Sequence, residues 1–325
     1  MDYMSSTRNR LIRLLSQQKE EFISGQKLSE LLNVSRSAIW KHMNELKKDG
    51  YVIEGVANKG YRIVKLPNIV SENTIAWGLN TNWIGKKIVH QEKIPSTQIL
   101  AHQLAQEGAE HGTIIVADEQ TDSRGRVNKR WYSAKNKGLW LSIILRPSIL
   151  PYLAPQLTLL TATVLADVLQ SHCCITPQIK WPNDILINEK KVAGILTEMQ
   201  AEQDHVLYVI VGIGLNVNQT NFKTDLKDRA TSLYLQTNKK WDLVPILQQL
   251  LRSFELKYDN YLLDGFQSVK AEWETYGFKL NEPLKIKTGS EEFEAIFRGI
   301  GEDGALLAER HEGNIQKIYS AEIGI

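Results

Sequence analysis

The residues from 119 to 131, EQTDSRGRVNKRW, concentrate positive charge around one glycine. Arg124 and Arg126 flank Gly125, and Lys129, Arg130 and Trp131 follow. A charged run of this kind is most often a solvated surface, so Arg-Gly-Arg alone is a weak motif. A functional interpretation requires a reaction that needs several cations around a mobile stretch of backbone.

One reaction with that requirement joins two anions. A substrate carboxylate cannot approach the α-phosphate of ATP until cations and backbone N–H groups offset their repulsion. The product would be an acyl-adenylate, a mixed anhydride that water destroys, so a loop folding over it would both stabilise and shield it. Lys180 and Lys191 supply further cations. GIGLN at 212 to 216 has no following helical pattern, and GAEHGT at 108 to 113 is not a P-loop, so we exclude Rossmann and Walker-type sites.

The composition is that of globular protein with two or three domains: 325 residues, 42% apolar and 23% charged. No apolar run approaches the roughly 18 to 20 residues of a membrane span, and the first residues lack a signal-peptide pattern, so we expect a cytoplasmic protein with no membrane partner. Cys173 and Cys174 are adjacent, which suits neither a mutual disulfide nor a metal site, and we expect them to pack. The net charge is +2, but residues 1 to 65 carry +5 and the remainder −3, which indicates an anionic partner for the N-terminal segment.

The N-terminal segment has the pattern of a winged helix-turn-helix. RNRLIRLLSQ, GQKLSELL and SRSAIWKHMNEL read as helices with a tight break at Asn33 and Val34, and YVIEGVANKGYRIVKL reads as a hairpin turning at Asn58 to Gly60. A bundle with a hairpin and no ligand is the alternative. The residues predicted to contact DNA, from the capped start of the second helix of the motif and from the wing, are Ser35, Arg36, Ser37, Trp40, Lys41 and Lys59.

The rest of the chain predicts two further domains. From about residue 86, strand patterns alternate with helical TQILAHQLAQEGA and APQLTLLTATVLADVLQSH, which is typical of an α/β or α+β catalytic domain. After about residue 278, short alternating runs separated by turn signals predict a small β-barrel. With PNIVSENT at 67 to 74 as a linker, we expect domains at 1–66, 67–277 and 278–325.

Four motifs together resemble those of a known family. STQ (96 to 98), EQTDSRGRVNKRW, KWPNDILINEKKVAGILTE (180 to 198) and GIGLNVN (212 to 218) follow the order and approximate spacing found in biotin–protein ligases. With the winged helix in front, the chain resembles, over nearly its whole length, the bifunctional type that is also the biotin operon repressor. The resemblance implies an α+β multidomain fold: winged helix-turn-helix, class II synthetase-like α/β catalytic domain and SH3-like C-terminal barrel.

The resemblance also implies an activity and partners. Biotin and ATP with Mg²⁺ would give biotinyl-5′-AMP and pyrophosphate, without a covalent enzyme intermediate. A lysine on the biotin carboxyl carrier domain of a biotin-dependent carboxylase would then attack the acyl carbon. The adenylate-bound protein would form a homodimer on operator DNA and repress transcription of biotin genes.

By motif position, the resemblance assigns site residues. Ser96, Thr97, Gln98 and Gln120 would bind the biotin ring. Arg124, Gly125, Arg126 and Lys191 would surround the biotin carboxylate and phosphate, with Lys191 and the two arginines stabilising the transition state. Trp131 would stack on adenine, Asn216 would lie on the nucleotide side, and Asn183 and Asp184 would orient phosphate or Mg²⁺, with no metal cage made by the protein alone.

Each assignment has a structural alternative. Trp131 and Trp181 could be core aromatics, and Ser96 and Thr97 could cap the following helix. Lys190 and Lys191 could be solvated turn residues, and Asp184 could pair with Lys180. At the level of function, the alternatives are a biotin sensor that binds DNA without ligating and a ligase for another acid such as lipoate.

Ser123 departs from the family pattern, which reads Gly-Arg-Gly-Arg where this chain reads Ser-Arg-Gly-Arg. If the family glycine has a positive φ, serine there costs on the order of 1 kcal/mol and restricts the loop. That restriction would affect loop closure, adenylate binding and coupled dimerisation. The resulting hypothesis is that Ser123→Gly tightens biotin and adenylate binding, as measured by calorimetry.

Overall fold

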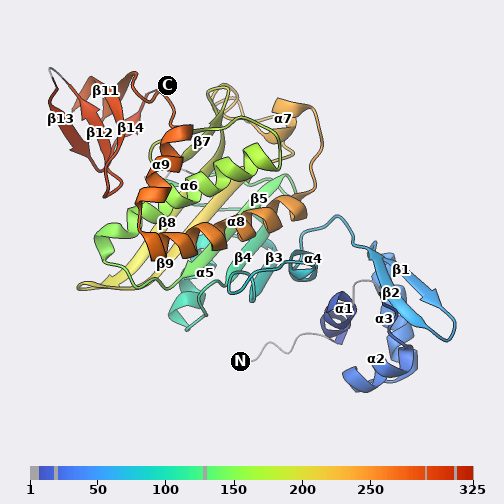
Figure 1. Ribbon diagram of the computed structural model, residues 1–325. Helices are drawn as coiled ribbons and strands as arrows, with labels where there is room; N and C mark the ends of the chain where they lie inside the picture. Colours follow the sequence, from blue (N-terminus) through green and yellow to red (C-terminus); the bar gives the residue numbers. More distant parts are fainter. Residues whose placement is uncertain (1–6, 18–20, 127–129, 290, 311–312, 325) are drawn as a thin grey trace. The chain divides into compact units, whose positions relative to one another are not determined.

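The computed structural model describes residues 7–17, 21–126, 130–289, 291–310 and 313–324. Lys129 therefore lies outside the described residues. The chain divides into two compact units, Met1–Asn80 and Thr81–Ile325, which we treat separately (Figure 1). The three-domain boundaries given above remain a prediction.

The first unit is a winged helix-turn-helix. Ser24 and Ser35 cap α2 and α3 by accepting N–H bonds from Lys27 and Ala38, and Asn33 turns the chain between these helices with a φ of 55°. The buried faces of the helices form one core, as their apolar spacing predicted. The elements are α1 (Thr7–Gln17), α2 (Gly25–Leu32), α3 (Arg36–Lys48), β1 (Val52–Val56), β2 (Gly60–Lys65) and α4 (Glu72–Ala76).

The wing is fixed to the segment before α2. Strands β1 and β2 pair antiparallel, and Ile23 forms a further bridge to Tyr61. Gly60 has a φ of +116°, and a Cβ there would lie 2.0 Å from the Ile23 carbonyl oxygen. Only glycine fits that approach, which explains the Asn-Lys-Gly turn of the predicted hairpin.

One expectation for this unit is wrong. The linker predicted at 67 to 74 contains the start of α4, where Ser71 and Thr74 form a capping box. Paired Ser and Thr side chains satisfy the first N–H groups of a helix, so even five residues can form one.

The second unit is built on a seven-stranded sheet in the order β3-β4-β5-β9-β8-β7-β6. Only β3 and β4 are parallel; the other pairs are antiparallel. The two helical runs predicted for this part of the chain form α5 and α6, which lie between strands as expected. The elements are β3 (Ile88–Ile94), α5 (Thr97–Gln106), β4 (Ile114–Gln120), β5 (Gly138–Leu145), α6 (Ala154–Ser171), β6 (Gln178–Lys180), β7 (Asp184–Ile187), β8 (Lys190–Glu202), β9 (His205–Asn216), α7 (Leu233–Thr237), α8 (Leu243–Asp264) and α9 (Gln267–Tyr276).

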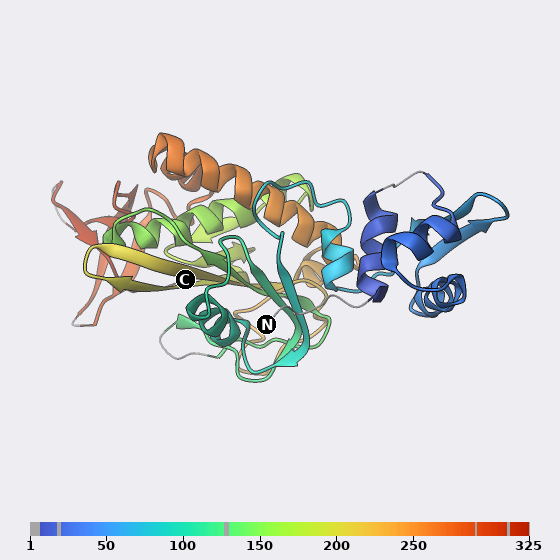
Figure 2. The same cartoon turned by 90° about the horizontal axis from the view of Figure 1, so that it is seen from below.

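Helices cover both faces of this sheet. Helices α6 and α8 pack on one face, and α5 packs on the other against β4, β5 and β9 (Figures 1 and 2). Every residue of β5 is consequently buried. The helical stretch Pro151–Ser171 is long and apolar enough by length and composition to span a membrane, contrary to our expectation. It is a core helix, because 72% of its most apolar window is buried inside the fold.

The C-terminal strands form a five-stranded antiparallel sheet in the order β13-β12-β11-β10-β14, which confirms the predicted short strands; closure into a barrel stays a prediction. The sheet is joined to the central part by the Trp181 indole, which donates to the Gly304 carbonyl at 3.1 Å. Gln156 of α6 makes a second link, donating to the Glu302 carbonyl at 2.7 Å. The strands are β10 (Pro283–Lys287), β11 (Glu292–Ile300), β12 (Leu306–Glu309), β13 (Ile315–Ile318) and β14 (Glu322–Ile323).

The two cysteines behave differently from each other. Cys173 is buried, and burial raises the pKa of its thiol to about 11. Cys174 is exposed, so the expectation that both pack is wrong for this residue.

Candidate active site

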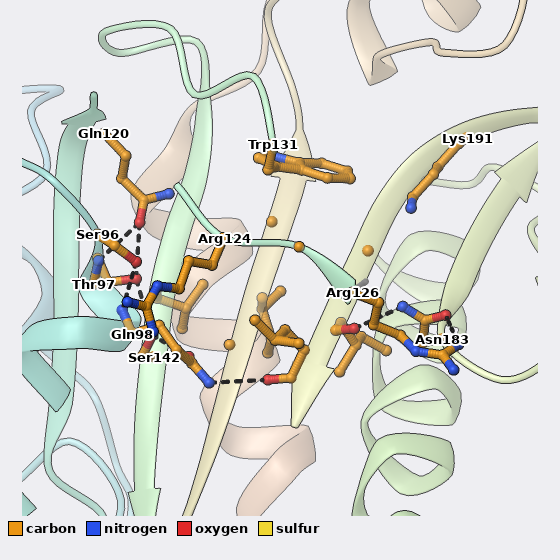
Figure 3. A pocket seen from close by; sticks show the side chains of 18 residues that line it. Ser96, Thr97, Gln98, Gln120, Arg124, Arg126, Trp131, Ser142, Asn183 and Lys191 are labelled. Carbon is orange, nitrogen blue, oxygen red and sulfur yellow. Dashed lines mark hydrogen bonds between the residues drawn. The ribbon is translucent and has the colours of Figure 1, made fainter. Parts of the chain in front are cut away.

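A cavity of about 470 Å³, partly open to solvent, lies over strands β4, β5, β8 and β9 (Figure 3). Most residues that we predicted for biotin, phosphate and adenine surround it, although they come from three separate stretches of sequence. The predicted residues that line the cavity are Ser96, Thr97, Gln98, Gln120, Arg124, Gly125, Arg126, Trp131, Asn183 and Lys191. The remaining lining residues are Leu141, Ser142, Gly194, Ile195, Leu196, Gly212, Ile213 and Gly214. Asp184 and Asn216 are not among the lining residues.

The floor of the cavity is made of glycine backbone. Gly194 on β8 pairs with Gly214 on β9, and Gly212 lies two residues before Gly214 on the same face. A Cβ on Gly194 would come within 2.9 Å of the Trp131 ring, one on Gly214 within 2.7 Å, and one on Gly212 within 2.5 Å of the Gln98 side-chain oxygen. The Trp131 indole therefore lies directly on the sheet, where the absence of side chains makes room for it.

At one end of the cavity, uncharged hydrogen-bonding groups lie beside the Arg124 side chain (Figure 3). The Gln120 side-chain oxygen accepts bonds from the Thr97 N–H at 2.8 Å and hydroxyl at 3.2 Å, while its amide nitrogen donates to the Ser133 hydroxyl at 2.9 Å. Ser96 accepts the Gln98 N–H at 3.2 Å and is the N-cap of α5, so the capping alternative describes this residue in the structure. The network fixes the direction of each donor and acceptor before any ligand is bound.

Ser142 belongs to this network and was missed from the sequence. It is fully buried, and its hydroxyl lies 2.9 Å from the Thr97 hydroxyl and 3.0 Å from the Gln98 side-chain oxygen. A buried hydroxyl is costly unless it is hydrogen-bonded. The signal was a single serine inside the apolar run GLWLSIIL, although a strand pattern alone does not say what such a residue faces.

The other end of the cavity is cationic. Lys191 makes an ion pair of 2.6 Å with Asp184, and its ammonium lies 5.1 Å from the centre of the Trp131 ring. The Arg126 guanidinium donates to the Asn183 side-chain oxygen at 3.0 Å. Burial lowers the pKa of Arg126, an effect that Asp184 and Glu322 oppose; the group stays charged. The positive charge of this end is thus held in place by short polar contacts.

These contacts bear on three of the structural alternatives given by the sequence, which concern the two lysines, the two tryptophans and Asp184. Lys190 and Lys191 begin β8, so neither is a solvated turn residue. Trp181 is buried at 5% exposure, as expected of a core aromatic, whereas Trp131 is only half-buried. Asp184 forms an ion pair with Lys191 and also lies opposite Lys180 in the pairing of β6 with β7, so its pairing with Lys180 stays a prediction.

The backbone of Lys191 is held on both sides. Its N–H donates to the Arg229 carbonyl at 2.8 Å, and its carbonyl accepts the Thr231 N–H at 2.9 Å. Asn216 also acts here: its amide nitrogen donates to the Thr231 carbonyl at 3.1 Å, and its side-chain oxygen accepts from Gln219 at 2.8 Å. Asn216 thus contacts the segment that holds the backbone of Lys191, and its role on the nucleotide side stays a prediction.

Behind the uncharged end lies a titratable cluster. His102 of α5 approaches Glu198 at 3.3 Å and the Tyr208 hydroxyl at 3.3 Å. The hydrogen bond from His102 is the main cause of the lowered pKa of the Glu198 carboxyl, with smaller contributions from the Gln98 side chain and the charge of Arg124. Arg124 itself is largely exposed. The Glu198 carboxylate thus places a negative charge close enough to Arg124 for the two charges to interact.

Ser123 does not have the strained backbone that our hypothesis assumed. It is absent from the residues with positive φ, it is buried at 5% exposure, and its hydroxyl donates to the Trp131 carbonyl. The predicted conformational cost of serine at this position is therefore not present in this structure. The side chain instead makes a contact that glycine could not make.

A second cavity, of about 900 Å³ and also open to solvent, lies between the central part and the C-terminal sheet. It shares Arg126, Asn183 and Ile195 with the first cavity, and its remaining lining is mainly apolar, including Trp181 and Met199. Within the described residues, no group of three or more His, Cys, Asp or Glu side chains could hold a metal ion.

In the first unit, the residues predicted to contact DNA all lie on the surface. Trp40 is 62% exposed although its neighbour Ile39 is buried in the helical core. The hydroxyl oxygens of Ser35 and Ser37 are 2.8 Å apart at the start of α3. The first backbone N–H groups of a helix have no partner within the helix and favour anions. The exposed set on α3 and in the wing comprises Ser35, Arg36, Ser37, Trp40, Lys41 and Lys59.

A winged helix-turn-helix unit followed by a cation-lined cavity defines a class of proteins that combine DNA recognition with binding of an acidic small molecule. Comparison with known proteins supports this class. Residues 7–62 match the HTH domain family, residues 90–216 the biotin/lipoate A/B protein ligase family, and residues 279–324 the biotin protein ligase C-terminal domain.

Individual relatives match over the full chain. The bifunctional ligase/repressor BirA of Bacillus spizizenii is 47% identical over 98% of both chains, and that of Escherichia coli is 28% identical over 97% of this chain and 96% of its own. The structure of the Aquifex aeolicus biotin protein ligase in complex with biotin and ATP is similar with a TM-score of 0.64 and 32% identity, covering 74% of this chain and 98% of that one. The chain belongs to the family of bifunctional biotin ligase/repressor proteins.

Proposed function

We propose that the protein activates biotin with ATP and transfers it to a lysine of a biotin carboxyl carrier domain. The observation that carries this proposal is the polarity of the cavity: neutral hydrogen-bonding groups at one end and Arg126 and Lys191 at the other. Biotin has the matching polarity, with a neutral ureido ring and a carboxylate.

In the first step, a biotin carboxylate oxygen attacks the α-phosphorus of ATP and pyrophosphate leaves. Both reactants are anionic, so cations must offset their repulsion where they meet. Lys191 can leave Asp184 for the incoming oxygens, while Arg124 and Arg126 surround the carboxylate and phosphates. Trp131 lies beside Lys191 and offers a flat surface for adenine.

In the second step, the lysine amine of the acceptor attacks the acyl carbon of biotinyl-AMP. The amide bond forms, AMP leaves as the anhydride bond breaks, and the proton lost by the amine passes to the departing phosphate or to water. Each bond change involves only the two substrates and the acceptor. The role of the protein is to orient these groups and stabilise their charge.

Mg²⁺ would accompany ATP and neutralise its phosphate charge. Asp184 fits this ion, because Mg²⁺ is commonly held by one or two carboxylates together with substrate phosphates. Asn183 fits less well in this conformation, since its side-chain oxygen accepts from Arg126 and its amide donates to the Ile195 carbonyl at 2.8 Å. We therefore assign Asn183 to holding Arg126.

The regulatory half of the proposal concerns the first unit. The adenylate-bound protein forms a homodimer in the cytoplasm and places two copies of α3 on a two-fold operator, repressing biotin genes. The exposed Trp40, Arg36 and Lys41 on α3 support this, because such side chains contact bases and phosphates in helix-turn-helix proteins.

Two experiments test these halves. Purified protein is incubated with biotin, MgATP and a biotin carboxyl carrier domain, and intact mass reports biotin on the acceptor lysine; lipoate in place of biotin tests the other acid. Absence of the biotin adduct contradicts the ligase, and preference for lipoate reassigns its substrate. In a gel shift with the promoter of a biotin-synthesis operon, binding that does not depend on biotin and ATP contradicts corepression.

A further inference from the structure

Ser123 connects the two sides of the cation-rich stretch. The residue is 5% exposed, and its hydroxyl donates to the carbonyl of Trp131, eight residues later. A buried hydroxyl in this position requires such a partner, and the carbonyl of Trp131 is the acceptor that the structure provides.

This bond is one of several connections between the two segments. Before it, the Gln120 side chain donates to the Ser133 hydroxyl at 2.9 Å. After it, Arg124 and Arg130 form an isolated antiparallel bridge. The chain entering the stretch and the chain leaving it therefore run side by side, and Ser123 provides the middle connection.

The side chains beyond this connection line the cavity. Arg124 and Arg126 follow Ser123 directly, and Trp131 carries the accepting carbonyl. The Trp131 ring lies on Gly194 and Gly214, so the position of its backbone determines where the ring meets the floor. The hydrogen bond from Ser123 to Trp131 thus links the backbone that carries the two arginines to the backbone that carries the indole ring.

We propose that Ser123 is a positioning residue: its hydrogen bond to Trp131 holds the arginines and the indole in the arrangement that receives the acid substrate. The inference rests on the proposed function. It reverses the direction of the hypothesis from the sequence, because removal of the side chain should weaken binding.

The effect should fall on binding and leave the chemical step unchanged. The bond lies outside the cavity, and we expect it to persist through the reaction, so its loss should weaken binding of the ground state and of the transition state to a similar extent. Such a change raises KM for biotin with unaltered kcat. A neutral hydrogen bond contributes about 1 kcal/mol, which corresponds to an about five-fold change in Kd.

The test compares Ser123→Ala, Ser123→Gly and Ser123→Thr with wild type, using calorimetry for the biotin Kd and carrier-domain labelling for KM and kcat. We expect about five-fold weaker binding and higher KM for alanine, at least that loss for glycine, and recovery with threonine, which keeps the hydroxyl. The KM for the carrier domain should not change in any variant.

Asp122→Asn is the matched control in the same stretch. Asp122 pairs with Arg130 at 3.1 Å, but both side chains are exposed, at 60% and 81%, and such pairs contribute little. Biotin binding by this variant should stay within two-fold of wild type, because an ion pair between two exposed side chains contributes little.

Each outcome has a definite meaning. Unchanged or tighter biotin binding by Ser123→Ala overturns the inference while the wild-type labelling still supports the ligase. Should Ser123→Ala fail to fold, weaker binding by Ser123→Gly with recovery in Ser123→Thr supports the inference, and equal binding overturns it. A wild-type protein that binds no biotin overturns the proposed function and this inference with it.

Discussion

The glycine floor gives a quantitative prediction for Gly214→Ala. The added Cβ would lie 2.7 Å from Cε2 and Nε1 of Trp131 and 3.1 Å from Cζ2. Carbon atoms in contact are normally about 3.5 to 4.0 Å apart, so the ring must rise from the floor by roughly 1 Å. The ring cannot do so without moving relative to Lys191, which lies 5.1 Å from its centre.

The magnitude follows from the cost of overpacking. Forcing one extra carbon into a packed site costs about 1 to 3 kcal/mol. If ligands need the wild-type position of the ring, the Kd for the nucleotide or for biotin should rise by about 5- to 150-fold, because each 1.4 kcal/mol corresponds to a factor of ten. Calorimetry with biotin and with a non-hydrolysable ATP analogue measures both constants.

Two comparisons decide whether the ring is the cause. Gly289→Ala is a control, because a Cβ there meets no atom within 4 Å. In a Trp131→Ala background, Gly214→Ala should cost little further, since the atoms that it would meet are gone. An equal loss with and without the Trp131 ring, or binding by Gly214→Ala within two-fold of wild type, refutes this reasoning.

Three further predictions concern other contacts. Lys191→Met should slow pyrophosphate release from biotin and ATP by about 10²- to 10³-fold with folding intact, because one stabilising donor is removed; an unchanged rate contradicts its role. Glu255→Ala should lower the free energy of unfolding by about 3 kcal/mol in urea titrations, since its carboxylate accepts three backbone N–H groups at 2.6, 2.8 and 3.0 Å; a loss below about 1 kcal/mol contradicts this estimate. His111 accepts the Arg146 N–H at 2.9 Å and burial lowers its pKa, so its contribution to stability should be complete above about pH 6.5 and decline as pH falls below it. His111→Gln should therefore flatten the pH dependence of the melting temperature in that range. If the melting temperatures of variant and wild type change equally steeply with pH, His111 is not the source of that dependence.

Much of the fold followed from local patterns in the sequence. Helix caps such as Ser35 and the Asn-Lys-Gly turn before Tyr61 are determined by residues close in the chain, and their elements appeared where predicted. Helix α4 was missed because five residues are too short for apolar periodicity to emerge.

The cavity could be predicted only in part. The motif containing Arg124 and Arg126 was recognisable because charge and glycine are visible in sequence. The glycine floor was not, because its function depends on the register that pairs Gly194 with Gly214 and on what lies above them. The ion pair between Lys191 and Asp184 was also missed. It forms because β7 pairs with β8, and separation along the sequence alone did not favour Lys191 over Lys180 as a partner of Asp184.

A floor made of backbone also limits how the cavity can be redesigned. Substitution at Gly194, Gly212 or Gly214 can only add atoms, so variation there makes the cavity shallower and never deeper. A library meant to admit a wider acid must therefore vary the wall that has volume to give up, where the Gln98 and Ser142 side chains line the same space. Shortening side chains on that wall creates room, whereas the three glycines are already at the smallest size that the genetic code allows.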